Sequence, residues 1–383
     1  MSKITFSLVG GQPFPVYAQA LDSKPDILVL FHSEQTKVNA QNIERCIRQK
    51  LPRVVVQLVE VAVNDLKKAY LTFAANAKVW LKPEHDITVN LSGGTKPWSM
   101  QLLKIFSGKE NVKCVFIDQN NRIWDMTTLT SHKFAHTEIS LDDKFSLFGV
   151  EATSRESLEN YSEDDFKAVA DVERLYRFDS KAFNEIVDQI EQDSRSGIKT
   201  GVYYSKNRAS FIERQDEGAF ECHFAKVNSQ NTETVTISSP HASRLLLSTG
   251  WFEVKVAQLL SKWYGASRVW LNTVIKYSSI SDPVNEIDIM VETTNDKLLF
   301  VECKTQVYAS TDIDKFNDVI KSYGGLGSKR VFITYWPMKA LAKGKCEALI
   351  IPQFSTSEVL RDDFSKRKFH EALDAYLDTI NAR

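Results

Sequence analysis

The first 118 residues repeat one unit: a short apolar run, a turn, and a stretch with helical period. The apolar runs are "KITFSLVG", "DILVLFHS", "RVVVQLVEV", "DITVNLSGG" and "VKCVFID", and helical stretches such as "QTKVNAQNIERCIRQKL" lie between most of them. This alternation predicts an open, mostly parallel sheet with helices on both faces, of the doubly wound α/β type. The segment "DQNNRIWDM" then indicates a hairpin that adds an antiparallel pair.

The chain has 383 residues, so we expect at least two domains. Its net charge is −1, and any polyanionic partner would therefore have to be met by local basic patches. The five cysteines are scattered without close pairs, which is typical of reduced thiols and argues against a structural zinc site. Without a secretory segment or a long apolar run, we expect a cytoplasmic protein with no membrane partner.

Three segments follow from the pattern along the chain. Residues 1–153 form the first domain, 154–238 form linker helices and small antiparallel strands, and 239–383 form a second α/β domain of a different kind. Ser162 and Asp165 resemble a capping box that opens a helix through Phe178. In the second domain we expect one long helix from Pro240, three strands in a meander, a helix from Asp312 to Tyr323, and a further strand "KRVFITYW".

Opposite charges occur at the end of the apolar strand "LLFVECKTQ". Glu302 and Lys304 are two residues apart and so face the same way, and a hairpin would place Asp288 of "NEIDIM" beside them. Adjacent buried carboxylates repel unless a cation lies between them, and Mg²⁺ or Mn²⁺ would supply that cation. Lys304 could then orient or help deprotonate the attacking water, or stabilise phosphoryl charge. Glu253 on the preceding helix is positioned to complete the metal shell or to hold one of its waters.

A structural alternative stays open for the same residues, because Glu302 and Lys304 could form an exposed ion pair worth about 0 to 1 kcal/mol. Glu286 is a secondary candidate beside Asp288, since it lies two positions away on the same face. The order of a glutamate on a helix, an aspartate on a strand and Glu-x-Lys on the next strand favours the catalytic interpretation.

A second group of candidates follows the late strand "DITVN" of the first domain. Gly93, Gly94, Thr95, Lys96 and Pro97 lead from this strand into a helix, and such a turn favours an anion near the backbone amides. The segment is neither a Walker A loop nor a dinucleotide fingerprint. A tight turn without a ligand is the structural alternative.

Further candidates for this anion site come from the loops after the first two strands. Gly11 and Gln12 follow the first strand, and Ser33 follows the second. In a doubly wound sheet these loops meet at the carboxyl edge, where ligands bind. We therefore expect Gly11, Gln12, Ser33, Ser92, Gly93, Gly94, Thr95 and Lys96 to bind one phosphate-bearing ligand.

Two family resemblances follow from these motifs. Glu253, Asp288, Glu302 and Lys304 resemble the PD-(D/E)xK nucleases of the restriction-endonuclease-like fold, with the usual proline displaced to Pro283. The pattern from Asn90 to Lys96 resembles the CARF sensors of type III CRISPR defence, and "LDDKFSLFGV" is similar to the segment that closes this domain. The order of the two parts resembles the CRISPR ancillary nucleases.

The resemblance implies a homodimer that binds a cyclic oligoadenylate, most often cyclic tetra-adenylate, across its sensor domains. It also implies an allosterically activated endonuclease that uses Mn²⁺ or Mg²⁺ to nick duplex DNA, cut single-stranded DNA or cut RNA. The alternative is a ligand-responsive regulator with a non-catalytic nuclease fold, and a third idea is that the first domain hydrolyses its own activator. Basic residues near the effector that could contact phosphates are Lys206, Arg208, Arg214 and Lys276.

Overall fold

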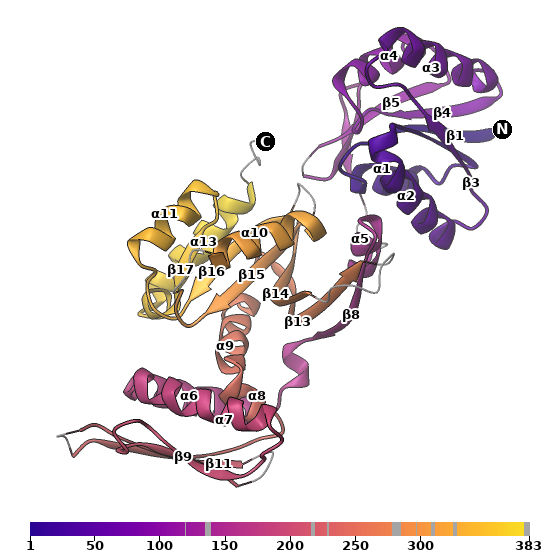
Figure 1. Ribbon diagram of the computed structural model, residues 1–383. Coiled ribbons are helices and arrows are strands. Elements are labelled where there is room, and N and C mark those ends of the chain that lie inside the picture. The colour runs from indigo at the N-terminus through magenta and orange to yellow at the C-terminus, as the bar shows by residue number, and fades with distance from the viewer. Residues whose placement is uncertain are drawn as a thin grey trace.

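The computed structural model describes residues 1–118, 120–134, 139–215, 219–227, 230–277, 285–295, 297–307, 311–324 and 328–378. In this part of the chain the strands form three sheets, of seven, four and six strands. Figure 1 shows them as three units, with the six-stranded sheet between the N-terminal domain and the four-stranded sheet.

The N-terminal sheet has the strand order β3-β2-β1-β4-β5-β6-β7. The first five strands in this order are parallel, and β6 and β7 are antiparallel additions. Their bounds are β1 (Ser2–Leu8), β2 (Ile27–His32), β3 (Val55–Glu60), β4 (His85–Asn90), β5 (Val112–Ile117), β6 (Arg122–Asp125) and β7 (Ser131–Lys133). The order 3-2-1-4-5 confirms the doubly wound fold predicted from the sequence.

Helices cover both faces of this sheet, α1 and α2 on one face and α3 and α4 on the other (Figure 1). Along β2, Leu28 and Leu30 belong to the core beneath α1 and α2, whereas Val29 and Phe31 belong to the core beneath α3 and α4. Because both faces are covered, a ligand reaches the sheet only at an edge. The helices are α1 (Phe14–Ser23), α2 (Lys37–Lys50), α3 (Leu66–Trp80) and α4 (Lys96–Phe106), with a short 3-10 helix η1 (Glu34–Thr36) before α2.

The chain leaves this domain through α5 (Leu141–Leu147) and β8 (Val150–Glu156). Ser140 caps α5 with its hydroxyl, which accepts a hydrogen bond from Asp143 N at 3.1 Å. β8 then pairs antiparallel with β13 (Ala266–Tyr277) at the edge of the six-stranded sheet. The domain boundary that we placed after residue 153 therefore falls inside β8, a strand of this six-stranded sheet.

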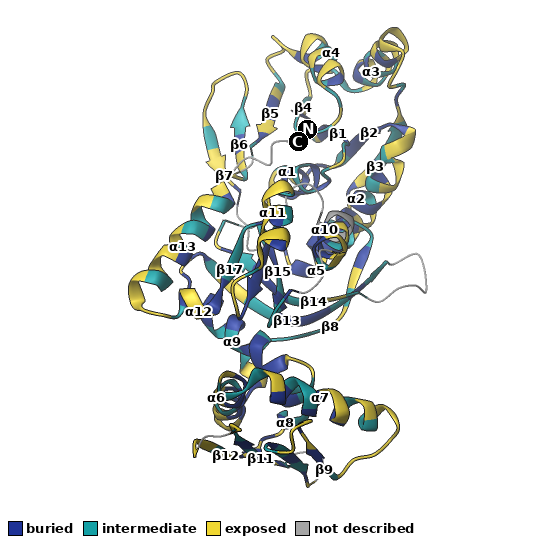
Figure 2. Cartoon of the chain, turned by 60° about the vertical axis from the view of Figure 1, so that its left-hand side comes forward, coloured by how far each residue is buried: buried dark blue, intermediate teal, exposed yellow. Residues whose placement is uncertain are grey.

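The middle unit packs helices on a small antiparallel sheet of order β12-β11-β10-β9. The Ser162 capping box opens its first helix as predicted, with Ser162 N donating to Asp165 Oδ2 at 2.8 Å. Inward side chains such as Phe220 and Phe224 are fully buried, and Figure 2 shows buried and exposed residues alternating along these strands. The elements are a short 3-10 helix η3 (Leu158–Asn160), α6 (Glu163–Phe178), α7 (Ser180–Arg195), β9 (Gly201–Tyr204), β10 (Phe211–Arg214), β11 (Ala219–Ala225) and β12 (Thr232–Ser238).

The single long helix expected from Pro240 is wrong, because the chain forms α8 (Ala242–Leu247) and α9 (Gly250–Ser261) with a break between them. Thr249 adopts the left-handed conformation with φ of 59°. A Cβ on Gly250 would lie 2.8 Å from the Arg244 carbonyl oxygen, so the close turn requires glycine there. Apolar periodicity continues through the break, and it therefore gave no sign of the bend.

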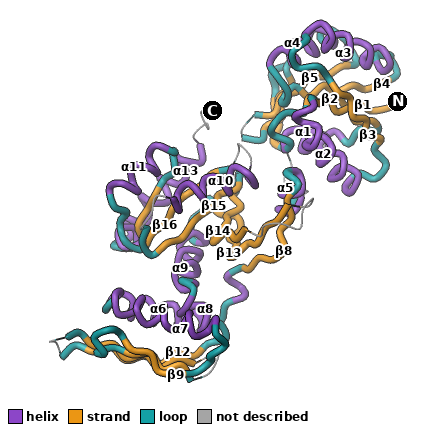
Figure 3. The backbone as a smooth tube through the Cα atoms, viewed as in Figure 1, coloured by secondary structure: helices purple, strands orange, loops and turns teal. Residues whose placement is uncertain are grey.

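The six-stranded sheet, which we call the effector sheet, has the order β17-β16-β15-β14-β13-β8. β13, β14 and β15 form the predicted antiparallel meander, and β15, β16 and β17 are parallel. One face packs on α9 and the other on α10, as the tube in Figure 3 makes visible. The remaining bounds are β14 (Asn285–Thr293), β15 (Leu298–Lys304), α10 (Thr311–Gly324), β16 (Lys329–Thr334), α11 (Ala340–Ala348), β17 (Gln353–Ser355), α12 (Thr356–Val359) and α13 (Asp363–Asp378).

Candidate functional sites

The first candidate site lies at the carboxyl edge of the N-terminal sheet, where the loops after β1 and β4 touch through their backbones. A Cβ on Gly93 would lie 1.9 Å from Leu8 O, and one on Gly10 would lie 2.9 Å from Gly94 N. Gly94 also has a φ of 69°. Glycine is therefore required where the two loops meet, and their amides are brought to one place. Gly11, by contrast, has open space around its missing Cβ.

Asn90 organises the loop after β4. Its Oδ1 accepts hydrogen bonds from Ser92 N at 3.0 Å and Ser92 Oγ at 2.6 Å, and its Nδ2 donates to Pro15 O at 3.2 Å. The Ser92 hydroxyl oxygen in turn accepts from Ile117 N at 2.7 Å. This network ties the ends of β4 and β5 to the start of α1, so the loop has a fixed shape before any ligand arrives.

Thr95 and Lys96 stand at the start of α4. Thr95 Oγ1 accepts a hydrogen bond from Trp98 N at 3.4 Å and caps the helix, while the Lys96 side chain is exposed. Ser33, at the end of β2, is occupied by a capping box in which its hydroxyl accepts from Thr36 N at 3.2 Å. Gln12 Nε2 is buried and has no hydrogen-bond partner in the described part of the chain. Lys96 and Gln12 thus offer a charge and an unused donor at this edge.

The second candidate site lies on β14 and β15. Ile289 pairs with Val301, and the same register continued by one residue sets Asp288 opposite Glu302. Asp288 Oδ2 accepts a hydrogen bond from Cys303 N at 2.7 Å, and Lys304 Nζ lies 2.8 Å from Glu302 Oε1. The structure therefore brings together the three strand residues that the sequence singled out.

The charges at this site crowd one another. Burial and the neighbouring Glu302 raise the pKa of Asp288 to about 7, against the opposing effects of Lys304 and the Cys303 amide. Burial, Asp288 and Glu286 raise the pKa of Glu253 to about 8, while Arg244 and Lys304 lower it. Burial opposes the charge of Lys304, but Glu302 and Asp288 keep its pKa above the ordinary value. Lys304 alone does not neutralise the negative charge of these carboxylates, and a bound divalent cation would do so.

The donor set fits a cation held by two carboxylates. Mg²⁺ commonly takes one or two protein carboxylates and keeps several waters, and Asp288 and Glu302 supply such a pair. Within the described ranges, no group of three or more histidine, cysteine, aspartate or glutamate side chains is placed to hold a metal ion. Glu253, in the first turn of α9, interacts with Asp288 through charge, and its expected place in the metal shell stays a prediction.

An ion-pair network that sequence reasoning missed lies beside Glu253. Glu156, the last residue of β8, accepts hydrogen bonds from Arg244 Nη1 at 2.5 Å, Tyr161 OH at 2.8 Å and Asn272 Nδ2 at 3.2 Å. Arg244 is held against α9 by the turn at Gly250. These residues come from separate segments of the chain, so no local spacing in the sequence could have indicated the network.

The four basic residues that could contact phosphates differ in their exposure and in their partners. Arg214 is buried at 7% exposure, and its Nη1 donates to Ser194 Oγ at 2.7 Å, so it faces the interior of the middle unit. Lys276 Nζ lies 3.8 Å from Glu151 Oε2. Lys206 and Arg208 lie in the turn between β9 and β10, and Arg208 covers the Tyr204 ring at 4.8 Å.

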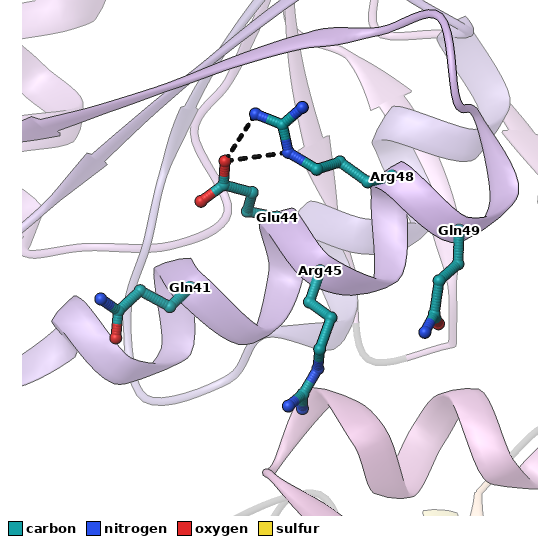
Figure 4. A pocket seen from close by; sticks show the side chains of 5 residues that line it. All are labelled: Gln41, Glu44, Arg45, Arg48 and Gln49. Atoms are coloured by element: carbon teal, nitrogen blue, oxygen red, sulfur yellow. Dashed lines mark hydrogen bonds and ion pairs between the residues drawn. The ribbon is translucent and has the colours of Figure 1, made fainter.

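A hollow of about 410 Å³ lies over the outer side of α2. Figure 4 shows its lining of Gln41, Glu44, Arg45, Arg48 and Gln49, with Arg48 paired to Glu44. Arg45 donates to Asn42 Oδ1 and to Ser146 O of α5, at 3.2 and 3.1 Å. Both arginines of the hollow are thus satisfied by the protein, and we assign the hollow no ligand.

Fold and sites together define a two-part protein, a doubly wound α/β domain joined to a second α/β domain with a carboxylate and lysine cluster. Residues 6–144 match the family model described as the Card1 CARF domain, and the N-terminal domain is therefore a CARF domain. This confirms the CARF resemblance indicated by the sequence.

Solved structures share the fold over nearly the whole chain. Can2 from Sulfobacillus thermosulfidooxidans, solved in complex with cyclic tetra-adenylate, has 16% identity and a TM-score of 0.68, and the match covers 98% of this chain and 100% of Can2. Protein VC1899 from Vibrio cholerae has 13% identity and a TM-score of 0.73, with 98% of each chain covered. These likenesses confirm the expected fold, a doubly wound N-terminal domain followed by a second α/β domain of a different kind.

A third structure shares the fold in part. A type III CRISPR defence DNA nuclease activated by cyclic oligoadenylate has 15% identity and a TM-score of 0.53, and the match covers 89% of this chain and 46% of that one. A search of curated proteins gave no match. In the described part of the chain, no helix is both long and apolar enough to cross a lipid bilayer.

Proposed function

We propose that the chain is a metal-dependent endonuclease of type III CRISPR defence, switched on by a cyclic oligoadenylate bound to its CARF domain. The observation that carries the proposal is the pairing of Asp288 with Glu302 and Lys304 on neighbouring strands of a nuclease-like domain. The cyclic tetra-adenylate bound to Can2 and the cyclic oligoadenylate that activates the CRISPR DNA nuclease support the choice of ligand class.

Asp288 and Glu302 would hold Mn²⁺ or Mg²⁺, and such an ion supplies a coordinated water of lowered pKa and polarises the phosphodiester. Lys304 Nζ, held 2.8 Å from Glu302 Oε1, would stabilise the negative charge that grows on the phosphoryl oxygens. Glu253 has a pKa of about 8 and can take up a proton near neutral pH. DNA, single-stranded or duplex, is the proposed substrate, with RNA as a second polynucleotide of the same backbone chemistry.

The activator site is proposed at the carboxyl edge of the CARF sheet, with Lys96 and the amides of Gly93 and Gly94 facing phosphates and Gln12 Nε2 donating to the ligand. Lys96, Met100 and Leu103 follow one another along one side of α4, and Met100 and Leu103 are 71% and 39% exposed. A second copy covering this apolar side gives a homodimer that presents two Lys96 side chains to one ring. A two-fold ligand such as cyclic tetra-adenylate suits that symmetry.

α5 is the proposed route from sensor to nuclease. Leu147 belongs to the CARF core, whereas Leu141 and Phe145 belong to the effector core. On the sensor side Lys50 Nζ lies 2.9 Å from Asp143 Oδ2, and on the effector side Lys144 Nζ lies 3.8 Å from Glu292 Oε2. A shift of α5 therefore changes contacts in both domains, which gives the activator a way to favour one arrangement of the nuclease.

The test is cleavage of supercoiled plasmid and labelled single-stranded DNA and RNA, with Mn²⁺ and a panel of cyclic oligoadenylates. We expect cleavage only with metal and one ring size, and loss of cleavage in Lys304→Met and Glu302→Gln with activator binding retained. Cleavage by both variants at the wild-type rate would remove the catalytic assignment.

The second candidate is a ligand-responsive regulator that binds nucleic acid without cutting it. The direct ion pair between Lys304 Nζ and Glu302 Oε1 at 2.8 Å favours it, because these two side chains also satisfy each other without a metal. Activator-dependent binding with no cleavage under any metal would establish this alternative.

A further inference from the structure

Trp336 lies just past the end of β16, next to the strand that carries Lys304. Its side chain is 36% exposed although its neighbour Tyr335 is buried at 3%. Tyr335 N donates to Lys304 O at 3.1 Å, and Trp336 N donates to Thr305 O at 3.3 Å. Backbone hydrogen bonding therefore continues beyond β15 and β16 and fixes the backbone of Trp336 beside the candidate catalytic strand.

Trp336 lies at the carboxyl end of the sheet, beyond the last residues of both strands, Lys304 of β15 and Thr334 of β16. Tyr335 packs against Trp251 of α9 at 5.4 Å between ring centroids, and the Trp336 ring contacts the Tyr335 ring. The indole therefore lies beside the end of the strand that carries Lys304.

The spacing suits a nucleotide next to the reacting phosphate. Trp336 N donates to Thr305 O, and Thr305 follows Lys304 directly, so the backbone of Trp336 lies next to the end of the candidate catalytic strand. The indole is anchored on one side by an edge-to-face contact with Tyr335, at 5.0 Å between ring centroids and an angle of 89°. Lys339, three residues further on, is exposed and adds positive charge near this edge.

We propose that Trp336 stacks on a nucleobase that flanks the phosphodiester held at Asp288, Glu302 and Lys304. This inference rests on the proposed nuclease function and assigns one further residue of its substrate site. A base–indole stack requires an unstacked base and tolerates every base type, since each base has a π face. Trp336 would thereby place the backbone of the strand over Lys304 without reading its sequence.

The first test measures binding without catalysis. The full-length protein with cyclic oligoadenylate and EDTA is titrated into labelled single-stranded DNA or RNA, and fluorescence anisotropy gives the Kd. We expect Trp336→Ala to weaken binding about 5- to 150-fold and Trp336→Phe to restore most of it. The matched control is Phe364→Ala on α13, which removes an aromatic ring that is 57% exposed in the same domain and should leave the Kd unchanged.

The second test locates the stacked base. In substrates with one abasic position near the cut site, wild-type cleavage should show a raised KM at a single position, and Trp336→Ala should be insensitive to the missing base at that position. A Trp336→Ala variant with wild-type Kd and the same abasic profile as wild type would overturn the inference. A variant that only melts earlier, with unchanged Kd, would overturn it too and show a packing role instead.

The two proposals fail in distinguishable ways. If the wild type cleaves normally and Trp336→Ala behaves like the wild type, only the stacking role of Trp336 is refuted. Wild-type protein that neither binds oligonucleotides with activator nor cleaves them with metal removes the nuclease function and this inference together.

Discussion

Asp288→Asn should stabilise the metal-free protein at alkaline pH, although it removes a residue proposed to be essential. The pKa of Asp288 is raised from an ordinary value of 3.8 to about 7 by burial and by Glu302. Because the folded state binds this proton more tightly than the unfolded state, ionisation costs stability increasingly from the ordinary pKa up to the raised one. At pH 8 that cost is about 4 kcal/mol, from about 1.36 kcal/mol for each pH unit of displacement.

An asparagine carries no charge, and its side-chain oxygen can still accept the hydrogen bond from Cys303 N. Allowing about 1 kcal/mol for the weaker acceptor, we expect a net gain of about 3 kcal/mol at pH 8 and under about 1 kcal/mol at pH 5. For a domain of this size the gain at pH 8 corresponds to about 5 to 10 °C in the melting temperature.

The assay is thermal unfolding with EDTA at pH 5 and pH 8, followed by the same scan with Mn²⁺. Manganese should raise the melting temperature of the wild type and have little effect on the variant. Asp188→Asn, which changes an exposed aspartate in α7, is the matched control and should be neutral at both pH values. Equal melting of Asp288→Asn and wild type at pH 8, or an equal gain at pH 5, would refute the charge crowding.

Three further outcomes are expected. Lys96→Ala should weaken activator binding at least about tenfold in calorimetry on the full chain, since it removes the exposed charge at the CARF edge, while leaving the melting temperature unchanged. Met100→Glu should convert a dimer into a monomer in light scattering, because it places a charge on the apolar side of α4; a dimer that survives would mean another face pairs. Lys144→Met should preserve activator binding but reduce activated cleavage, because Glu292 loses its cation at the effector end of α5; unchanged activation would rule out this contact as part of the route.

The sequence predicted the elements whose pattern is local. The five parallel strands, the Ser162 cap and the meander of β13 to β15 all follow from period, turn residues and caps. The approach of Asp288 to Glu302 was also predictable, because a hairpin fixes which residues face each other. The register in the structure agrees with that reasoning.

The rest depends on contacts between distant segments. The break between α8 and α9 arises from the packing of Gly250 on Arg244, and the Glu156 network joins segments far apart in the chain. Trp336 ends an apolar run and gave no signal of its own; only the hydrogen bond from Trp336 N to Thr305 O places it next to the strand that carries Lys304. Gly10 was overlooked because its neighbour Gly94 is remote in the sequence, although their loops touch.

β8 has a consequence for how the two halves can be separated. The edge strand of the six-stranded sheet, β8, is separated from β13 in the chain by the whole middle unit, α6 to β12, and it pairs with the twelve-residue β13. A fragment cut at residue 154 or 239 would leave the backbone amides and carbonyls of β13 open to pairing with other chains, so it should aggregate. We therefore expect that the CARF domain can be exchanged between proteins of this fold only when the junction lies before Val150. Natural recombination breakpoints in such proteins should also lie before this residue.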